Sequence, residues 1–370
     1  MTTGRGRFTS RAGFVLAAAG SAVGLGNIWG FPTQVVSNGG GAFVLVYLLL
    51  TLGLAYPALM AELIIGRFAG ANVVTALQKI QPDGVGRKFG YVIASASIVA
   101  ACLILSFYAI VAGWLLAFLA ATVVDLAGVS TNWLVQEGLG RNLLFTGLFY
   151  IFTIAIVARG VETGIERASK ILMPLLFGLL IVLTAYVLTL AGAGEGLVVY
   201  LSPDFSQLAD PGLLISALGQ AFFSLSLGVG GMLIYGSYLG KEENLPAVGA
   251  LVTLTDSSIA FLAGLLILPA IYVAEYRGLT VFSSDGSIAA GPDLAFVVFP
   301  PLFDSMGIIG VFTGLAFFSL MSIAAVTSSI AMLEVPVSLL VEKKAVARPT
   351  AAVTSGTLIF LVSAAIIFQF

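Results

Sequence analysis

The chain has 370 residues, of which 59% are hydrophobic and only 9% are charged, and its mean hydropathy is +1.09. This composition excludes an ordinary soluble domain, in which about a quarter of the residues are charged, and indicates an integral membrane protein. The chain has no histidine and a single cysteine, Cys102, so we expect neither a Cys/His metal cluster nor an internal disulfide.

Nine apolar segments are long enough to cross a bilayer, whose core of about 30 Å needs about 20 helical residues. The candidate spans are about 12–36, 41–66, 90–123, 142–158, 168–191, 213–238, 248–275, 307–340 and 349–370. No hydrophilic segment is long enough to fold separately. The sequence therefore predicts an all-α integral membrane protein with one domain over residues 1–370, surrounded by the lipid bilayer.

Lysine and arginine are unevenly distributed over the segments between these spans. With the N-terminus in the cytoplasm, only Arg141 and Arg277 of the 16 basic residues lie outside. The cytoplasmic ones are Arg5, Arg7, Arg11, Arg67, Lys79, Arg87, Lys88, Arg159, Arg167, Lys170, Lys241, Lys343, Lys344 and Arg348. By the positive-inside rule we expect a multi-pass protein of the plasma (cytoplasmic) membrane with a cytoplasmic N-terminal tail. No basic stripe suited to nucleic acid is present.

The first span contains the stretch GSAVGLGNIWGFP, residues 20–32. Its glycines could simply let helices pack closely, since Gly20 and Gly24 have small-xxx-small spacing. Packing does not explain Asn27, because an amide in the hydrocarbon layer is costly without a polar or ionic partner. We interpret the stretch as a helix break, which frees backbone carbonyls for a cation and N–H groups, those of Leu25 and Gly26, for an anion.

The sixth span contains a similar interruption, FFSLSLGVGG. Two glycine-interrupted helices in corresponding positions of two halves indicate an inverted-repeat transporter with a site at the membrane midplane. The repeats would cover about residues 11–191 and 213–370, the second one incomplete.

Residues 276–306 form the longest predicted connection between spans. An apolar stretch, Leu294 to Phe299, lies within it and is flanked by glycines and prolines. This pattern predicts a short re-entrant or capping element, with a plain extracellular loop as the alternative.

Polar residues also occur inside the last spans. Asp256 lies several residues into the seventh span, where a carboxylate costs about 2.5 to 3.5 kcal/mol, so it should be paired or functional. Thr327 and Ser328 in the eighth span could be cation ligands, or their hydroxyls could bond back to the preceding turn.

The segments GSAVGLGNIWGFP, GQAFFSLSLGVGG and AAVTSSIAML resemble the signature segments of the neurotransmitter:sodium symporter family, bacterial amino acid branch, and the resemblance covers nearly the whole chain. It implies a leucine-transporter-like (5+5) helix bundle with helices 1 and 6 broken, and two Na⁺ sites. The implied ligands of sodium 1 are the substrate carboxylate with Ala22, Asn27, Ser224 and Asp256. Those of sodium 2 are Gly20, Val23, Ala324, Thr327 and Ser328.

Asp256 bears on chloride dependence. Relatives that need chloride resemble this segment but have asparagine near this position. The carboxylate lowers the positive charge of the buried site by one, so we expect transport that is independent of chloride. If the match is displaced by one residue, onto Thr255, this expectation weakens.

The resemblance also implies which substrate binds. Monoamine carriers of the family have an aspartate where this chain has Gly24, so the substrate should bring its own carboxylate and be an amino acid. Tyr108 would donate to that carboxylate, with Ala22, Phe223, Ser224 and Ser226 around the amine. The expected side-chain pocket consists of Ile104, Phe223, Val229 and Met332, with Ser21 and Ser328 nearby. Val229 replaces a phenylalanine of some relatives, which favours large hydrophobic or aromatic amino acids.

The gates follow the family only in part. Arg5 resembles the gating arginine of the inner side, with Glu342 as its expected partner. Gly164 and Pro174, at the start of the fifth span, match a family pattern in which this helix end unwinds. On the outer side Gly30 replaces the usual arginine, which leaves Tyr108 and Phe223 as the expected gate. The tenth span is missing, so we expect the sequence to be truncated.

These features predict a symporter that carries an amino acid into the cell with sodium by alternating access, without an organic cofactor. The alternative is an amino acid sensor that binds but does not transport, which the missing arginine and tenth helix would favour. An enzyme is not expected, because no nucleophile and base pair is visible.

Overall fold

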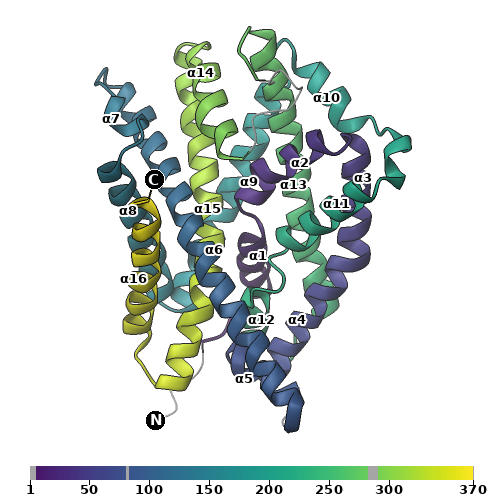
Figure 1. Ribbon diagram of the computed structural model, residues 1–370, viewed down its shortest axis with the longest axis vertical. Helices are drawn as coiled ribbons and strands as arrows, with labels where there is room; N and C mark the ends of the chain where they lie inside the picture. Colours follow the sequence, from purple (N-terminus) through teal and green to yellow (C-terminus); the bar gives the residue numbers. More distant parts are fainter. Residues whose placement is uncertain (1–5, 81–82, 282–290, 370) are drawn as a thin grey trace.

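The computed structural model describes residues 6–80, 83–281 and 291–369, most of which are helical. These residues form no β-strand, only an isolated bridge between Gly40 and Pro203. Figure 1 shows the long helices running side by side, with α5 at one end of the bundle and α7, α10 and α14 at the other. We call these the N-terminal end and the opposite end. The predicted all-α fold is confirmed.

The described residues form the following helices in chain order. They are α1 (Arg11–Ala22), α2 (Phe31–Ser37), α3 (Gly41–Leu50), α4 (Tyr56–Ala69), α5 (Val73–Ile80), α6 (Gly84–Asp125), α7 (Asn132–Val135), α8 (Leu139–Ala158), α9 (Arg167–Val187), α10 (Ala193–Leu201), α11 (Pro211–Ser224), α12 (Gly231–Ser237), α13 (Leu245–Tyr276), α14 (Phe299–Asp304), α15 (Ile308–Lys344) and α16 (Arg348–Ile367). Single π-helical turns at Gly26–Gly30, Thr51–Ala55, Val161–Glu166 and Leu294–Val298 precede α2, α4, α9 and α14, and a 3-10 turn at Phe205–Ala209 precedes α11.

The nine predicted spans all correspond to helices. Among the described residues, seven helices, some including a π-helical turn, have the length and hydropathy to cross a membrane, and α1 with α2 forms an eighth candidate span bent by 58°. The predicted sixth span is α11 followed by α12, with residues 225–230 between them. The short helices α5, α7 and α10 fall outside the predicted spans, and α6 extends beyond the predicted 90–123 at both ends.

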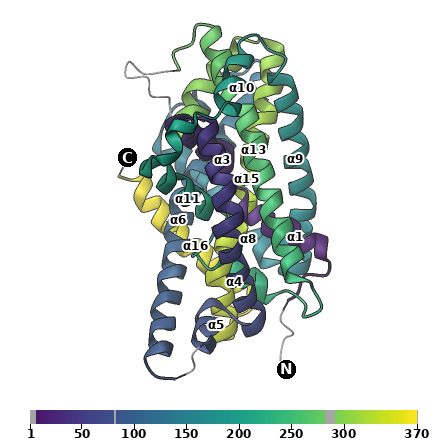
Figure 2. The same ribbon diagram turned by 90° about the vertical axis from the view of Figure 1, so that its right-hand side faces the viewer.

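Helix α1 lies in the centre of the bundle, where it packs against α9, α13 and α15. Its residues from Ala17 to Ala22 are all buried. The outer surface of the bundle is apolar, as Phe68 with 74% exposure and Ile215 with 72% illustrate. Figure 2 shows the same bundle from the side, with α5 again at the N-terminal end. Exposed large apolar side chains around a helix bundle are typical of contact with lipid.

The apolar stretch after residue 291 forms a short helical element, Leu294–Asp304, at the opposite end. The ring of Phe296 contacts Trp29, Trp114 and Phe118, with centroid distances of 6.4, 5.8 and 5.0 Å. The element therefore caps α1/α2 and α6, and the alternative of a plain loop is wrong for these residues. Residues 282–290 of the same connection lie outside the described part of the chain.

Candidate functional site

Two helices break at the same depth of the bundle. Helix α1 ends at Ala22, where Val23 is extended (φ −71°, ψ 112°), and helical structure resumes at Gly26. Helix α11 ends at Ser224, and the residues before α12 include positive φ angles at Ser226 (54°), Gly228 (84°) and Gly230 (83°). Glycine adopts these angles at little cost, so Gly228 and Gly230 favour the second break. The predicted broken helices 1 and 6 are confirmed.

Side chains satisfy the backbone carbonyls that the first break exposes. The Ser226 hydroxyl donates to the Ser21 carbonyl at 3.0 Å. From α15, the Ser328 hydroxyl donates to the carbonyls of Ser21 (3.2 Å) and Val23 (2.9 Å). The two breaks and α15 are thus joined by hydrogen bonds, as required where unpaired carbonyls lie in an apolar interior.

A cavity lies between the two breaks. It is lined by Ser21, Ala22, Gly24, Leu25, Gly26, Asn27, Ile104, Tyr108, Phe223, Ser226, Leu227, Val229, Ser328 and Met332. Every residue predicted to contact the substrate is present except Ser224, which is 1% exposed and lies outside the lining. Leu227 was not among the predicted pocket residues, and Asn27 was predicted only as a sodium ligand. We call this cavity the central pocket.

Gly24 and Tyr108 meet at one wall of the central pocket. The backbone N–H of Leu25 donates to the Tyr108 hydroxyl at 3.4 Å. A Cβ atom added to Gly24 would lie 2.7 Å from the Ser328 Oγ and 3.2 Å from the Tyr108 hydroxyl. A side chain at position 24 would therefore have to displace the Ser328 hydroxyl, and the Tyr108 hydroxyl, which accepts from Leu25, can donate its own proton to an anionic group.

Asn27, Ser224 and Asp256 form a buried polar cluster beside the pocket, each at most 1% exposed. The Asn27 amide donates to Ser224 Oγ (2.9 Å) and to the Asp256 carboxylate (2.8 Å), and the Ser224 hydroxyl donates to Asp256 at 2.6 Å. The structure thus brings Asp256, and not Thr255, together with Asn27 and Ser224, two of the other predicted ligands of sodium 1. We call these three residues the carboxylate cluster.

The predicted ligands of sodium 2 meet where α1 faces α15. Gly20 lies against Thr327, whose Cβ would be 3.2 Å from a Cβ added to the glycine. The Thr327 hydroxyl bonds back to the carbonyls of Ile323 and Ala324, both at 3.1 Å, whereas the Ser328 hydroxyl crosses to α1. Back-bonding therefore describes Thr327 but not Ser328. We call Gly20, Val23, Ala324, Thr327 and Ser328 the neutral cluster.

Both clusters offer hard oxygen donors. Within the described ranges, no group of three His, Cys, Asp or Glu side chains gathers as a metal site. Carbonyl, hydroxyl and carboxylate oxygens without imidazole or thiolate suit an alkali or alkaline-earth cation and not zinc or copper. The donor sets therefore fit sodium.

The predicted gate residues have different outcomes. Arg5 lies outside the described residues, and Glu342 accepts hydrogen bonds from the backbone N–H (2.7 Å) and side-chain amide (2.8 Å) of Asn72. Phe223 lines the central pocket but is 61% exposed. Gly30 has no atom within 4 Å of an added Cβ, so open space surrounds the position of the usual arginine.

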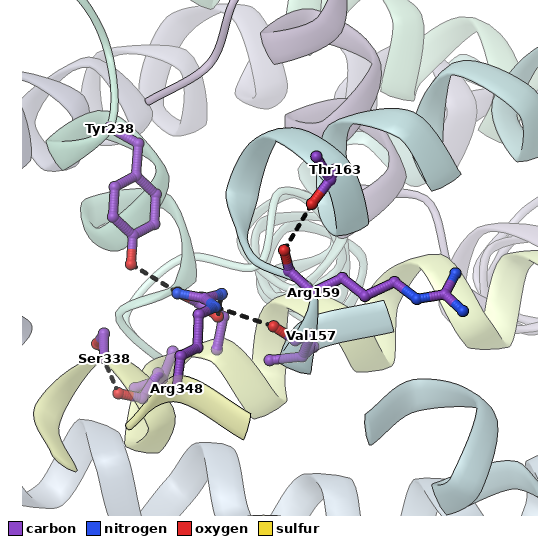
Figure 3. Close-up of polar contacts among 8 residues, drawn as sticks. Val157, Arg159, Thr163, Tyr238, Ser338 and Arg348 are labelled. Carbon is purple, nitrogen blue, oxygen red and sulfur yellow. Dashed lines mark hydrogen bonds and ion pairs between the residues drawn. The ribbon is translucent and has the colours of Figure 1, made fainter. Parts of the chain in front are cut away.

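A polar network at the N-terminal end was not predicted (Figure 3). Glu334 is fully buried and accepts from the Tyr238 hydroxyl and from Arg348, both at 2.5 Å, and Arg348 Nε donates to the Val157 carbonyl at 2.9 Å. A second missed carboxylate, Glu62, accepts from the Gly228 N–H at 2.7 Å. Both acids lie inside predicted spans, so the argument that singled out Asp256 could have found them.

Comparison with known proteins identifies the family. The model of the sodium:neurotransmitter symporter family matches residues 5–138 and 134–369. A Bacillus subtilis protein named as an uncharacterized sodium-dependent transporter, YhdH, is 39% identical over 96% of this chain and 77% of its own length. The sodium- and chloride-dependent taurine transporter of Bos taurus is 28% identical over 91% of this chain and 61% of its own.

A solved structure agrees with these relatives. The crystal structure of MhsT in complex with L-phenylalanine has a TM-score of 0.83 and 43% identity, and the match covers 98% of this chain and 80% of MhsT. The family model and the two sequence relatives carry the names of symporters or sodium-dependent transporters. The chain belongs to the sodium:neurotransmitter symporter family, a family of sodium-dependent membrane transporters.

Proposed function

We propose that the protein carries an amino acid into the cell together with sodium by alternating access. The observation that carries this proposal is that Asn27 belongs both to the lining of the central pocket and to the carboxylate cluster. A substrate carboxylate in the pocket would be within reach of a sodium ion at the cluster. Binding of each would then strengthen binding of the other by the same factor.

The pocket suggests how the substrate lies. Its carboxylate would face Leu25 and Tyr108, where donors are available and position 24 has no side chain. Its ammonium group would face carbonyls near Ala22, Phe223 and Ser224, with the Ser226 hydroxyl. Ile104, Leu227, Val229 and Met332 give the pocket an apolar wall. This wall, and the L-phenylalanine named in the MhsT structure, favour a large hydrophobic or aromatic amino acid.

Two sodium ions would accompany the substrate. The first would bind at the carboxylate cluster with the Ala22 carbonyl and the substrate carboxylate, and the second at the neutral cluster. Asp256 supplies one buried negative charge, so transport should not need chloride.

Alternating access needs contacts that break at each end. With the N-terminal end in the cytoplasm, the inner side would be closed by the Glu334–Arg348 pair, by Glu342 and by the ring of Phe8. The Phe8 ring contacts Tyr235 and Tyr238. Arg5 stays the predicted partner of Glu342. The outer side would be closed by Tyr108, by Phe223 and by the rings of Trp29, Trp114 and Phe296.

Uptake by sealed proteoliposomes tests the proposal. We expect labelled phenylalanine or leucine to accumulate with an inward gradient of sodium sulfate, and equally with sodium chloride, but not with potassium sulfate. Equal uptake with and without sodium would contradict the coupling of the amino acid to sodium. Uptake that is much lower in sodium sulfate than in sodium chloride would contradict chloride independence. Sodium-dependent binding without uptake would favour the alternative of a sensor.

A further inference from the structure

Glu166 is a buried carboxylate that the proposed function does not use. It ends the π-helical turn before α9, and its side chain is 1% exposed. It accepts hydrogen bonds from the backbone N–H (2.7 Å) and the hydroxyl (2.8 Å) of Thr9 and from the hydroxyl of Ser10 (2.9 Å). It also forms an ion pair with Lys170 at 2.6 Å. Because Thr9 and Ser10 directly precede α1, these hydrogen bonds join the start of α1 to the start of α9. We call them the Glu166 contact.

Helices α1 and α9 lie side by side from this contact to the neutral cluster. A Cβ atom added to Gly13 of α1 would overlap the carboxyl group of Glu166. One added to Gly20 would lie 3.1 Å from the Sδ atom of Met173 in α9 and 3.2 Å from the Cβ atom of Thr327. Gly20 follows Gly13 by seven positions, as Met173 follows Glu166, and residues seven apart lie on one face of a helix. The two glycines thus let α1 lie closely against α9 up to the neutral cluster.

The place of α1 determines whether the neutral cluster is complete. The cluster takes two of its carbonyls from α1 and its hydroxyls from α15, and the Ser328 hydroxyl reaches the Val23 carbonyl at 2.9 Å. If the start of α1 moved away from α9, Glu166 would lose its three hydrogen bonds from that segment and would retain the ion pair with Lys170, whose side chain is 41% exposed. Hydrogen bonds to a carboxylate are stronger than those between neutral groups. The Glu166 contact therefore favours the arrangement in which the ligands of the neutral cluster meet.

We propose that Glu166 is a positioning residue for sodium at the neutral cluster. By holding the start of α1 against α9, the Glu166 contact keeps the α1 carbonyls within reach of Thr327 and Ser328, and it thereby raises the affinity of the cluster for sodium. Since sodium and the contact favour the same arrangement, sodium at the cluster should in turn hold the start of α1 in place. The proposal rests on the proposed binding of sodium at the neutral cluster.

Backbone hydrogen exchange over residues 9–20 tests the proposal, measured by mass spectrometry on the full chain in nanodiscs. Sodium sulfate replaces potassium sulfate stepwise at constant ionic strength, without amino acid. In the unmodified protein we expect sodium to slow the exchange, and the midpoint of this titration reports sodium binding. Thr327→Val should raise the midpoint, which assigns it to the neutral cluster. Amino acid affinity at saturating sodium is measured separately by equilibrium binding.

Glu166→Gln keeps the size of the side chain and removes its charge. Exchange in potassium should become at least about tenfold faster, because hydrogen bonds to a charged group are weakened. The sodium midpoint should rise at least about threefold, because a smaller share of the protein has α1 in place. Amino acid affinity at saturating sodium should stay unchanged. Glu162→Gln is the matched control: Glu162 is an exposed acid of the same π-helical turn, so its loss should change neither quantity.

Thr9→Val removes one donor of the Glu166 contact and keeps the branched shape of the side chain. It should change the exchange and the sodium midpoint in the same direction as Glu166→Gln, by a smaller factor, and it serves as the test if Glu166→Gln does not fold. Unchanged exchange in α13 shows that a variant is folded.

The outcomes distinguish this proposal from the proposed function. If sodium leaves the exchange of the unmodified protein unchanged, sodium does not bind at the neutral cluster, and both fail. If sodium slows the exchange with the same midpoint in the unmodified protein and in a folded Glu166→Gln variant, only the role of Glu166 is overturned. A loss of amino acid affinity at saturating sodium as large as the rise in the midpoint would also overturn it, because Glu166 would then act on the whole fold.

Discussion

The carboxylate cluster and the neutral cluster lie on either side of the break in α1, but they differ in charge and in origin. The carboxylate cluster takes side chains from three elements: Asn27 beside the first break, Ser224 at the end of α11 and Asp256 in α13. The neutral cluster combines backbone carbonyls of α1 with hydroxyls of α15 and contains no charged residue.

This difference in charge predicts which cluster controls substrate binding. Asn27 lines the central pocket, so a substrate carboxylate in the pocket would directly attract a cation at the carboxylate cluster. The neutral cluster joins α1 to α15. It should therefore affect mainly the affinity for the cation and the packing of these two helices. Changes near the carboxylate cluster should therefore affect amino acid binding most.

The largest effect is expected from Gly24→Asp. The new side chain would meet Ser328 and Tyr108 at van der Waals overlap and would repel a substrate carboxylate, which costs several kcal/mol. We expect amino acid affinity to fall more than about 100-fold in equilibrium binding. Gly24→Ala controls for the steric part and should lose less. Retained affinity in Gly24→Asp would refute the assignment of the carboxylate end.

Asp256→Asn removes the fixed charge of the carboxylate cluster. Removing one partner of a buried charge pair costs about 2–5 kcal/mol, so sodium-dependent binding in sulfate buffer should weaken at least about 30-fold. Chloride should restore part of the loss, because an anion replaces the missing charge. Asp204→Asn, at an exposed aspartate, is the matched control. If Asp256→Asn binds the amino acid in sodium sulfate as tightly as the unmodified protein does, the charge of Asp256 does not distinguish the carboxylate cluster from the neutral cluster.

Tyr108→Phe removes one donor from the central pocket. A hydrogen bond to a charged group contributes about 1.5–3 kcal/mol, so amino acid affinity should fall at least about tenfold at saturating sodium. Tyr56→Phe loses a hydroxyl that bonds to Pro246 far from the pocket and should have little effect. Calorimetric titration distinguishes the two. Equal affinities would remove Tyr108 from the carboxylate end of the site.

The smallest effect is expected at the neutral cluster. Thr327→Val should raise the sodium concentration for half-maximal binding about threefold and leave amino acid affinity at saturating sodium unchanged, since its hydroxyl contributes about 1 kcal/mol or less. Thr313→Val removes a similar back-bonded hydroxyl from the same helix and serves as control. An equal loss of amino acid affinity would show that the clusters are not distinct in function.

The two helix breaks and Asp256 could be predicted from the residues themselves because their signals are local, whereas the other residues that line the central pocket followed only from the family resemblance. Glycines and serines inside membrane-length segments indicated both breaks, and a carboxylate inside a span indicated Asp256. Each of these residues is unusual for its position, so it can be recognised without knowing what lies beside it.

Contacts between distant segments were harder to predict. The pairing of Glu334 with Arg348 joins α15 to the start of α16, and the contact of Phe296 with Trp29 depends on where the connection before α14 folds back. The apolar stretch predicted a capping element, but apolar side chains are common throughout the chain, so the sequence does not identify which rings the cap contacts. The short helices α5, α7 and α10 were missed because they are below the length of a span.

Equilibrium binding of a panel of labelled amino acids to the purified protein, in sodium sulfate and in potassium sulfate, tests the central claim most directly. The account predicts saturable binding of a large hydrophobic or aromatic amino acid in sodium and none in potassium. Equal binding in both salts, or no binding of any amino acid in sodium, would contradict it.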